Sequence, residues 1–318
     1  MLRGVDLHAA LAALPDGVIT LHHLRATGRD AAFASRAARA GRLRRVRPGC
    51  YVRAPQWESA TTEQRHRWLV EATGSSAAES PVFSHESAAA LWGLPVVEKA
   101  RDLAAHVVEP WRGGGTARVG RRTHVDWDGM QVVEQDGVRL TSAADTVLAL
   151  ARDRPFIVGV AVADAALRRG LVTRAALDER NAATASKRGA RRAALVTSFA
   201  DERAESPGES ISRARIHELG LAAPELQTTV ADGRGPIGRV DFWWPGARVV
   251  GEFDGRVKYR TDGVDDRRRV EDRLWDEKLR EDRLRAVAAG FSRWTWATVW
   301  DPPALARRLV AAGVPRGR

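Results

Sequence analysis

The stretch that most constrains the fold is residues 239–258, RVDFWWPGARVVGEFDGRVK. Its first part alternates apolar and polar residues with the period of a β-strand, Pro245-Gly246 is a strong turn dipeptide, and a second apolar run follows. We therefore expect a β-hairpin with Asp241 on its first strand and Glu252 and Asp254 on its second. Glu252 and Asp254 are two residues apart, so they share one face of that strand.

Carboxylates within apolar strands need a compensating charge. Burial of a carboxylate is costly unless it is paired, and acids on adjacent strands repel one another. A hard cation such as Mg2+ removes this repulsion and takes oxygen ligands, often one or two carboxylates together with a substrate phosphate. The pattern therefore predicts a metal site at Asp241 and Glu252, filled by Mg2+ or Mn2+. The alternative is a hairpin whose surface acids pair with the many arginines.

The order of Asp, short hairpin, Glu-x-Asp-Gly and then Lys resembles the PD-(D/E)XK nuclease superfamily, and most closely its very-short-patch-repair-like branch. The resemblance covers about residues 203–312. It implies a restriction-endonuclease-like mixed sheet flanked by helices, with Asp241 and Glu252 as metal ligands. Lys258 is a candidate for the catalytic lysine, and the alternative is that cutting is lost. The superfamily usually has Lys two residues after the Glu, where this chain has Asp254.

Weaker candidates lie near this hairpin in the sequence. In the nuclease branch, a Glu on the first helix lies beside the metal, so the resemblance implies roles for Glu209 and Arg213 on the helix predicted over residues 209–219. Gln227, on the following predicted strand, is a further candidate. A long helix rich in Arg, Asp and Glu, predicted over residues 264–289, resembles the helix that lines the DNA cleft in that branch.

Residues 1–54 predict a winged helix-turn-helix. Three short helices are followed by a two-stranded wing over residues 43–52 that turns at Pro48-Gly49. Basic side chains on the second helix of the turn and on the wing suit phosphate contacts, which supply most non-specific affinity for DNA. The alternative is a winged helix used for protein contact. The predicted DNA-binding residues are Arg29, Ser35, Arg36, Arg39, Arg42, Arg44, Arg45 and Arg47.

The sequence GRLRRVRPGCYV, residues 41–52, resembles the winged-helix domain of the AbiEi family of type IV antitoxins. The motifs SHESAAALWGLP, residues 84–95, and DAALRRGLVT, residues 164–173, resemble the region that follows this domain in AbiEi-like proteins. This resemblance implies a mixed α/β middle region that serves as a scaffold and partner surface. It also permits an antitoxin role with a cognate toxin.

Two features of the middle region invite other interpretations. His85 and Glu86 follow the predicted helix cap Ser84, but His106 and His124 lie in separate predicted strands, so we expect no third ligand at metal-binding spacing. We therefore predict a structural or capping role for this pair. Asp164, inside an apolar helix that we expect to be buried, is predicted to pair with Arg168, four residues further on.

Charge and length bound the remaining possibilities. A net charge of +11 favours nucleic acid, before an anionic membrane, as the partner, although a high-GC genome also inflates the arginine content. Cys50 is the only cysteine, which excludes disulfide frameworks, and no apolar run approaches 18 residues.

We predict a cytoplasmic, multidomain α+β and α/β chain. Its parts are 1–54, the AbiEi-like region 60–185, a helical basic link 186–206 and the nuclease-like domain 207–318.

The functional hypothesis is metal-assisted hydrolysis of phosphodiesters, with double-stranded DNA as the expected substrate. Asp241, Glu252 and the Phe253 carbonyl would hold Mg2+, which polarises a phosphoryl oxygen and activates a bound water. Lys258 would orient that water or neutralise the charge that develops on the phosphate, and Asp254 would act as a second ligand or bind a water. An alternative from another class is a non-catalytic, antitoxin-like transcriptional repressor with a degenerate nuclease fold. A third alternative is a nuclease that acts on RNA.

Overall fold

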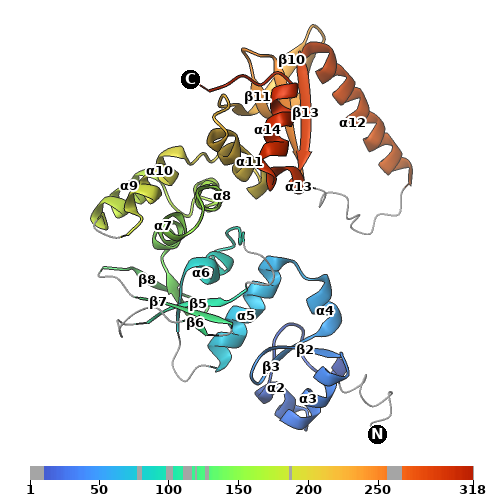
Figure 1. Ribbon diagram of the computed structural model, residues 1–318. Helices are drawn as coiled ribbons and strands as arrows, with labels where there is room; N and C mark the ends of the chain where they lie inside the picture. The colour runs from blue at the N-terminus through green and yellow to red at the C-terminus, as the bar shows by residue number, and fades with distance from the viewer. Residues whose placement is uncertain are drawn as a thin grey trace. The chain divides into compact units, whose positions relative to one another are not determined.

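The computed structural model describes residues 11–76, 81–97, 103–109, 117–118, 120–125, 129–185, 188–255 and 267–317 (Figure 1). Lys258 lies outside these residues. The described part is mixed α/β, as predicted, with 13 helices and three sheets. It divides into two compact units, residues 1–150 and 151–318, each considered by itself below. The finer boundaries expected from the sequence stay predictions. No described helix is both long and apolar enough to cross a lipid bilayer.

The first unit begins with a small sheet and two helices. Thr20 caps the first of these helices by accepting a hydrogen bond from the His23 backbone N–H, and Asp30 caps the second by accepting one from Phe33. The sheet is antiparallel with the order β1-β3-β2, and Gly49 takes a φ of 76° in its turn. The elements are β1 (Ile19–Thr20), α2 (Leu21–Ala26), α3 (Ala31–Arg39), β2 (Leu43–Arg47) and β3 (Cys50–Arg53).

The rest of the first unit is a six-stranded mixed sheet with the order β6-β7-β5-β4-β9-β8. The pairs β5–β7 and β4–β9 are parallel and the others antiparallel, and α5 and α6 pack against β5. The helices are α4 (Ala54–Ser59), α5 (Thr62–Ser76), α6 (His85–Leu91) and α7 (Ala143–Asp153), the last of which runs past residue 150. The strands are β4 (Val82–Phe83), β5 (Ala105–Glu109), β6 (Ala117–Arg118), β7 (Arg121–Val125), β8 (Val132–Gln135) and β9 (Val138–Thr141).

The second unit begins with four helices, α8 (Phe156–Arg168), α9 (Arg174–Ala183), α10 (Ala190–Phe199) and α11 (Pro207–Glu218). The prediction that the apolar helix is buried is confirmed, because every residue of α8 from position 157 to 167 is buried. The predicted partner of Asp164 is wrong. Its carboxylate pairs with Arg213 of α11 at 3.0 Å and accepts the Asp201 backbone N–H, whereas Arg168 donates to the Ala204 carbonyl.

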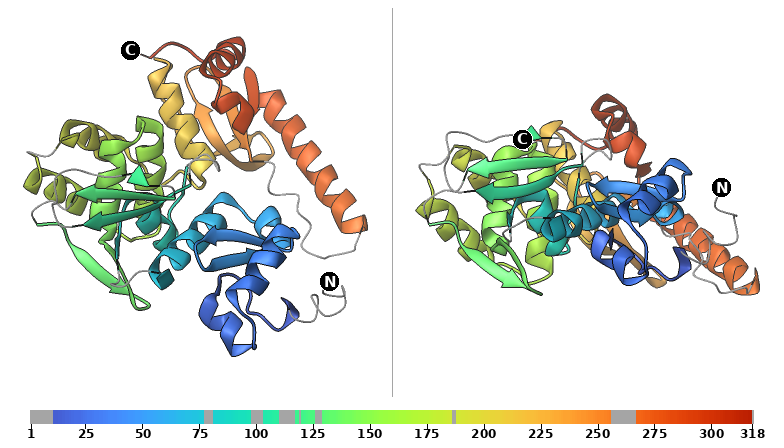
Figure 2. Two further views of the ribbon diagram at one scale, coloured as in Figure 1. Left: turned by 60° about the horizontal axis from the view of Figure 1, so that its bottom comes forward. Right: turned by 90° about the horizontal axis from the view of Figure 1, so that it is seen from below.

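The second unit ends in a four-stranded sheet with the order β10-β11-β12-β13. Its elements are β10 (Glu225–Asp232), β11 (Gly235–Trp244), β12 (Val249–Asp254), α12 (Arg267–Val287), β13 (Gly290–Thr295), α13 (Trp296–Val299) and α14 (Pro302–Ala311). The predicted hairpin is present as β11 and β12. The first three strands are antiparallel, and β13 lies parallel to β12 because α12 makes the crossover, packing along the sheet (Figures 1 and 2).

Contacts between β13 and α11 fix one face of this sheet. The indole N–H of Trp294 donates to Ser212 Oγ of α11 at 2.8 Å, and the Trp294 side chain is buried. Gly251 permits this packing, because a Cβ at that position would lie 2.7 Å from the Trp294 ring. The sheet is therefore attached to the helix that precedes it.

The buried ion pair gives the first prediction. Arg213→Met leaves the buried Asp164 carboxylate without its cation, so we expect the free energy of unfolding to fall by about 3–5 kcal/mol. The double variant Asp164→Leu/Arg213→Met should recover at least half of this loss, since no charge is then left buried. Chemical denaturation monitored by circular dichroism measures both effects.

The matched control is Arg203→Met. Arg203 pairs with Asp201 but is largely exposed, so its loss should cost at most about 1 kcal/mol. If Arg213→Met cost no more than Arg203→Met, the buried pair would not be an important contribution to stability.

Candidate functional site

The acids of the hairpin come together at the β11–β12 ladder. Phe242 pairs with Gly251, so the next positions along the two antiparallel strands, Asp241 and Glu252, lie opposite each other. Asp241 Oδ2 accepts the Phe253 backbone N–H at 2.8 Å. Two of the sequence candidates for a metal therefore lie side by side on adjacent strands.

Gln227 links Asp241 to α11. Its amide Nε2 donates to Glu209 Oε2 at 2.8 Å and to Asp241 Oδ1 at 3.4 Å. Gln227 adopts a φ of 52° within β10, between residues paired with Phe242 and Val240. A non-glycine residue in the left-handed region carries strain that is often found at functional sites. The sequence does not reveal this conformation, and Gln227 was the weaker candidate.

Glu209 has a second role, at the start of α11. Ser206 Oγ donates to Glu209 Oε1 at 2.7 Å and accepts the Glu209 backbone N–H at 3.2 Å, so the two residues cap the helix. The Glu205 backbone N–H also donates to Glu209 Oε2. The carboxylate is buried, and its contact with Gln227 connects the helix cap to Asp241. Arg213, the other candidate on α11, is in the buried pair with Asp164.

Glu252 is held by two guanidinium groups. Arg280 of α12 donates to its Oε1 at 2.9 Å, and Arg293 of β13 donates to its Oε2 at 2.6 Å. Burial opposes the charge of Arg293, but the hydrogen bonds and charge of Glu252, with the charges of Glu281 and Glu277, outweigh burial and raise its pKa. Glu252 is therefore paired with arginines, as the alternative interpretation of the hairpin predicts. The sequence alone does not identify Arg280 and Arg293 as its partners.

Acids nevertheless outnumber guanidinium groups among the described residues of this network. Glu281 contacts both Arg293 and Arg285, and Glu277 contacts both Arg280 and Arg293. The five carboxylates exceed the three guanidiniums by two. The carboxylates are those of Glu209, Asp241, Glu252, Glu277 and Glu281, and the guanidiniums are those of Arg280, Arg285 and Arg293. The oxygen donors suit a hard divalent cation at Asp241 and Glu252, which would replace a guanidinium on Glu252.

Asp254 ends β12 opposite Thr295 of β13, two residues beyond Glu252 on the same face. Its side chain is partly exposed. It therefore lies further along the strand than the Asp241–Glu252 pair.

The predicted DNA-binding residues fall into two groups. Arg36, Arg39, Arg42, Arg44 and Arg45 are exposed on α3, on β2 and in the turn between them. The remaining three are partly buried: Ser35 lies on α3, Arg29 stacks on the Phe33 ring, and Arg47 donates to the Gly120 carbonyl at 3.1 Å. Burial, and then the charge of Arg121, lower the pKa of Arg47. Arg47 is thus engaged within its own unit.

One expectation for the middle region is wrong. The separate strands of His106 and His124 do not keep these residues apart from His85, because one ligand atom from each lies within 4.8 Å of the others. The sequence carries one signal for this group, which is that His106 and His124 lie on two different predicted strands. A parallel pairing of two such strands brings their residues together.

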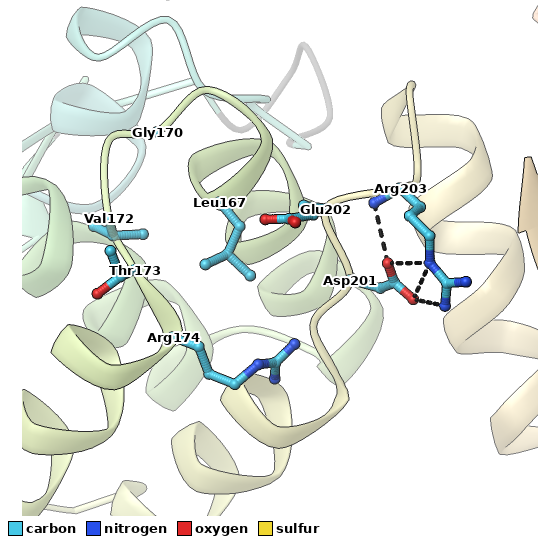
Figure 3. A pocket seen from close by; sticks show the side chains of 8 residues that line it. All are labelled: Leu167, Gly170, Val172, Thr173, Arg174, Asp201, Glu202 and Arg203. Atoms are coloured by element: carbon cyan, nitrogen blue, oxygen red, sulfur yellow. Dashed lines mark hydrogen bonds and ion pairs between the residues drawn. The ribbon is translucent and has the colours of Figure 1, made fainter.

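A cavity of about 590 Å³ in the second unit contains none of the predicted site residues. Figure 3 shows Asp201 and Arg203 paired on one side of it and Arg174 on the other. Arg174 donates to the carbonyls of Thr197, Ser198 and Ala200. The charges of Arg174, Asp201 and Arg203 are therefore bound within the protein.

The chain is similar to uncharacterized proteins over about half of its length. No protein-family model matches the chain. Two uncharacterized proteins of Mycobacterium tuberculosis, from strains CDC 1551 / Oshkosh and ATCC 25618 / H37Rv, are each 33% identical to it over 170 residues. The match covers 53% of this chain and 60% of each relative, so the chain spans less than two thirds of their length.

The attachment of α12 to the sheet gives the second prediction. Hydrogen bonds from Arg283, one turn from Arg280, lower the pKa of Asp232 from 3.8 to about 2. A depressed pKa means that Asp232 stabilises the fold above pH 4 and that this contribution is lost as the pH falls towards 2. Carbon-detected NMR of the Asp232 carboxyl group should show this low midpoint, and Arg283→Gln should return it towards 3.8.

Arg234→Gln is the control, since it keeps the backbone N–H that Arg234 donates to Asp232 and removes only its charge, the smallest of the causes, so it should move the midpoint much less than Arg283→Gln does. An unchanged Asp232 midpoint in Arg283→Gln would mean that α12 is not attached to the sheet through this pair.

Proposed function

We propose that the chain is a cytoplasmic DNA-binding protein whose C-terminal domain hydrolyses phosphodiesters with the help of a divalent metal. The observation that carries the proposal is the position of Asp241 and Glu252, each one residue beyond the Phe242–Gly251 pair on adjacent strands, with Gln227 and Glu209 hydrogen-bonded behind Asp241. The order α11, β10, β11, β12, α12, β13, with the last strand parallel to the third, also agrees with the restriction-endonuclease-like domain expected from the resemblance.

Each group has a task in this proposal. Asp241 and Glu252 would hold Mg2+ or Mn2+, which when bound polarises a phosphoryl oxygen and lowers the pKa of a bound water. Gln227 orients the Asp241 carboxylate through its amide, and Glu209 fixes that amide. Arg280 and Arg293 bring positive charge to the position where a phosphate would meet the two acids.

The N-terminal part would hold the protein on double-stranded DNA. Two short helices followed by a β2–β3 hairpin agree with a winged helix-turn-helix, and the exposed arginines of α3 and β2 provide phosphate contacts. The resemblance to AbiEi-like antitoxins extends the proposal to a protein partner, a cognate toxin, on the middle region.

A second candidate function follows from the two guanidinium contacts of Glu252. A carboxylate held by Arg280 and Arg293 is already neutralised, which suits a domain that binds DNA without cutting it. The chain would then be a non-catalytic, antitoxin-like transcriptional repressor.

A cleavage assay separates the two candidates and gives the third prediction. Supercoiled plasmid should be cut by the parent protein with Mg2+ or Mn2+ and spared with a chelator. Asp241→Asn and Glu252→Gln should each lower the cutting rate by at least about 100-fold, because the lost metal ligand supplies several kcal/mol of transition-state stabilisation.

Asp282→Asn is the matched control, since it makes the same acid-to-amide change at an exposed position of α12 and should leave the rate unchanged. Gel retardation without cutting under either metal would reject the enzyme and favour the repressor. The same assay with RNA as substrate tests the third alternative.

DNA affinity gives the fourth prediction. Arg36→Gln/Arg45→Gln removes two exposed cations of α3 and β2, so the slope of log affinity against log salt should fall by about 2. Fluorescence anisotropy with a labelled duplex, repeated at several salt concentrations, measures the slope.

Arg307→Gln/Arg308→Gln makes the same charge change on exposed residues of α14 and should alter the slope little. Equal effects of the two double variants would indicate that net charge, and not the N-terminal surface, determines binding.

A further inference from the structure

Three histidines from distant parts of the first unit meet on one face of its six-stranded sheet. His106 lies in β5 and His124 in the parallel strand β7, where Val108 pairs with His124, so the two histidines project from the same face. His85 opens α6, and the Ser84 backbone N–H before it donates to the His106 carbonyl at 3.0 Å. The start of α6 is therefore attached to the strand that carries His106.

The imidazole rings are in direct contact. His106 Nδ1 lies 2.9 Å from His124 Nε2, and the rings of His85 and His124 stack with centroids 3.6 Å apart. Ligand atoms from all three residues lie within 4.8 Å of one another. At most one hydrogen can lie between the two facing nitrogens, so at least one of them presents a lone pair to the cluster.

A carboxylate is buried beside these rings. Glu86 Oε2 lies 3.2 Å from His106 Nδ1, and Glu86, His85 and His106 are all buried. Burial of an acid is costly without a compensating positive charge. A divalent ion among the three imidazoles would add positive charge beside this acid. The partly buried His124 leaves one side of the cluster open to solvent.

The surrounding residues hold the cluster in place. Ser87 Oγ accepts the His106 backbone N–H at 2.8 Å and lies 3.0 Å from His66 Nε2. His85 adopts a φ of 47°, a conformation that a residue other than glycine keeps only when its surroundings impose it. Such strain is common where a side chain must be aimed at a ligand.

We infer that His85, His106 and His124 bind one divalent transition-metal ion of the zinc class, with Glu86 as the balancing carboxylate. Imidazole nitrogens suit Zn2+, whereas Mg2+ prefers oxygen. Tetrahedral Zn2+ with bonds of about 2.0–2.1 Å needs ligand nitrogens about 3.4 Å apart, within the range that small side-chain rotations of this cluster reach. The site lies in the first unit and involves no residue of the proposed nuclease site.

The test measures metal binding directly and gives the fifth prediction. The full-length protein is stripped with a chelator, dialysed and titrated with Zn2+ against a chromophoric competitor. One Zn2+ should bind per chain, Co2+ should give the visible absorption of a tetrahedral site, and Zn2+ but not Mg2+ should raise the melting temperature.

Two variants locate the site. His124→Gln changes the partly buried ligand, the one whose loss disturbs packing least, and should weaken Zn2+ binding by at least about 100-fold. Glu86→Gln should weaken it by about 10- to 100-fold. His22→Gln changes an exposed histidine outside the cluster and should bind Zn2+ as the parent does.

Several results would overturn the inference. They are the absence of Zn2+ binding by the parent, unchanged affinity in a folded His124→Gln, or an equal loss in His22→Gln, which would indicate adventitious binding at surface histidines. The parent stoichiometry and the Co2+ spectrum remain decisive even if a variant fails to fold. A cluster held by shared protons alone would show no Co2+ absorption and no Zn2+-dependent rise in melting temperature.

Discussion

The burial of Glu252 in the central hairpin is the constraint on which the C-terminal sheet depends. A carboxylate at this position requires positive charge from elsewhere, and the chain supplies it from α12 and from β13. Glu252 therefore connects the crossover helix to β12 and adds a side-chain contact to the parallel ladder that joins β13 to it. The same contacts limit what the hairpin can bind, because any cation at Glu252 must compete with Arg280 and Arg293.

Local patterns in the sequence were sufficient wherever the structure depends on neighbouring residues. The alternation and Pro-Gly turn predicted the hairpin, and Thr20 and Asp30 cap the helices expected of them. Local patterns gave the wrong partner where the true partner is distant in the sequence. Asp164 was assigned to Arg168 because spacing of four residues is visible in a sequence, whereas Arg213, on another helix, is not.

The histidine cluster shows the same limit more clearly. His106 and His124 are separated along the chain by β6, and only the pairing of β5 with β7 makes them neighbours. Their predicted location in different strands argues against a shared ligand, although adjacent parallel strands bring such residues together. The left-handed conformations of Gln227 and His85 were likewise hidden, because neither residue type favours that region as glycine does.

The net positive charge of this protein favours an anionic partner, whereas its buried acids favour a cation. The overall +11 follows from arginines, many of them exposed, and a compositional bias can add such residues at little energetic cost. A composition rich in arginine does not explain a hairpin network in which carboxylates exceed guanidiniums, or a buried Glu86 beside three imidazoles. Buried acids are costly wherever they occur. The buried acids that lie beside other possible cation ligands, at the hairpin and at the histidine cluster, are therefore better guides to cation binding than the total charge is to nucleic acid.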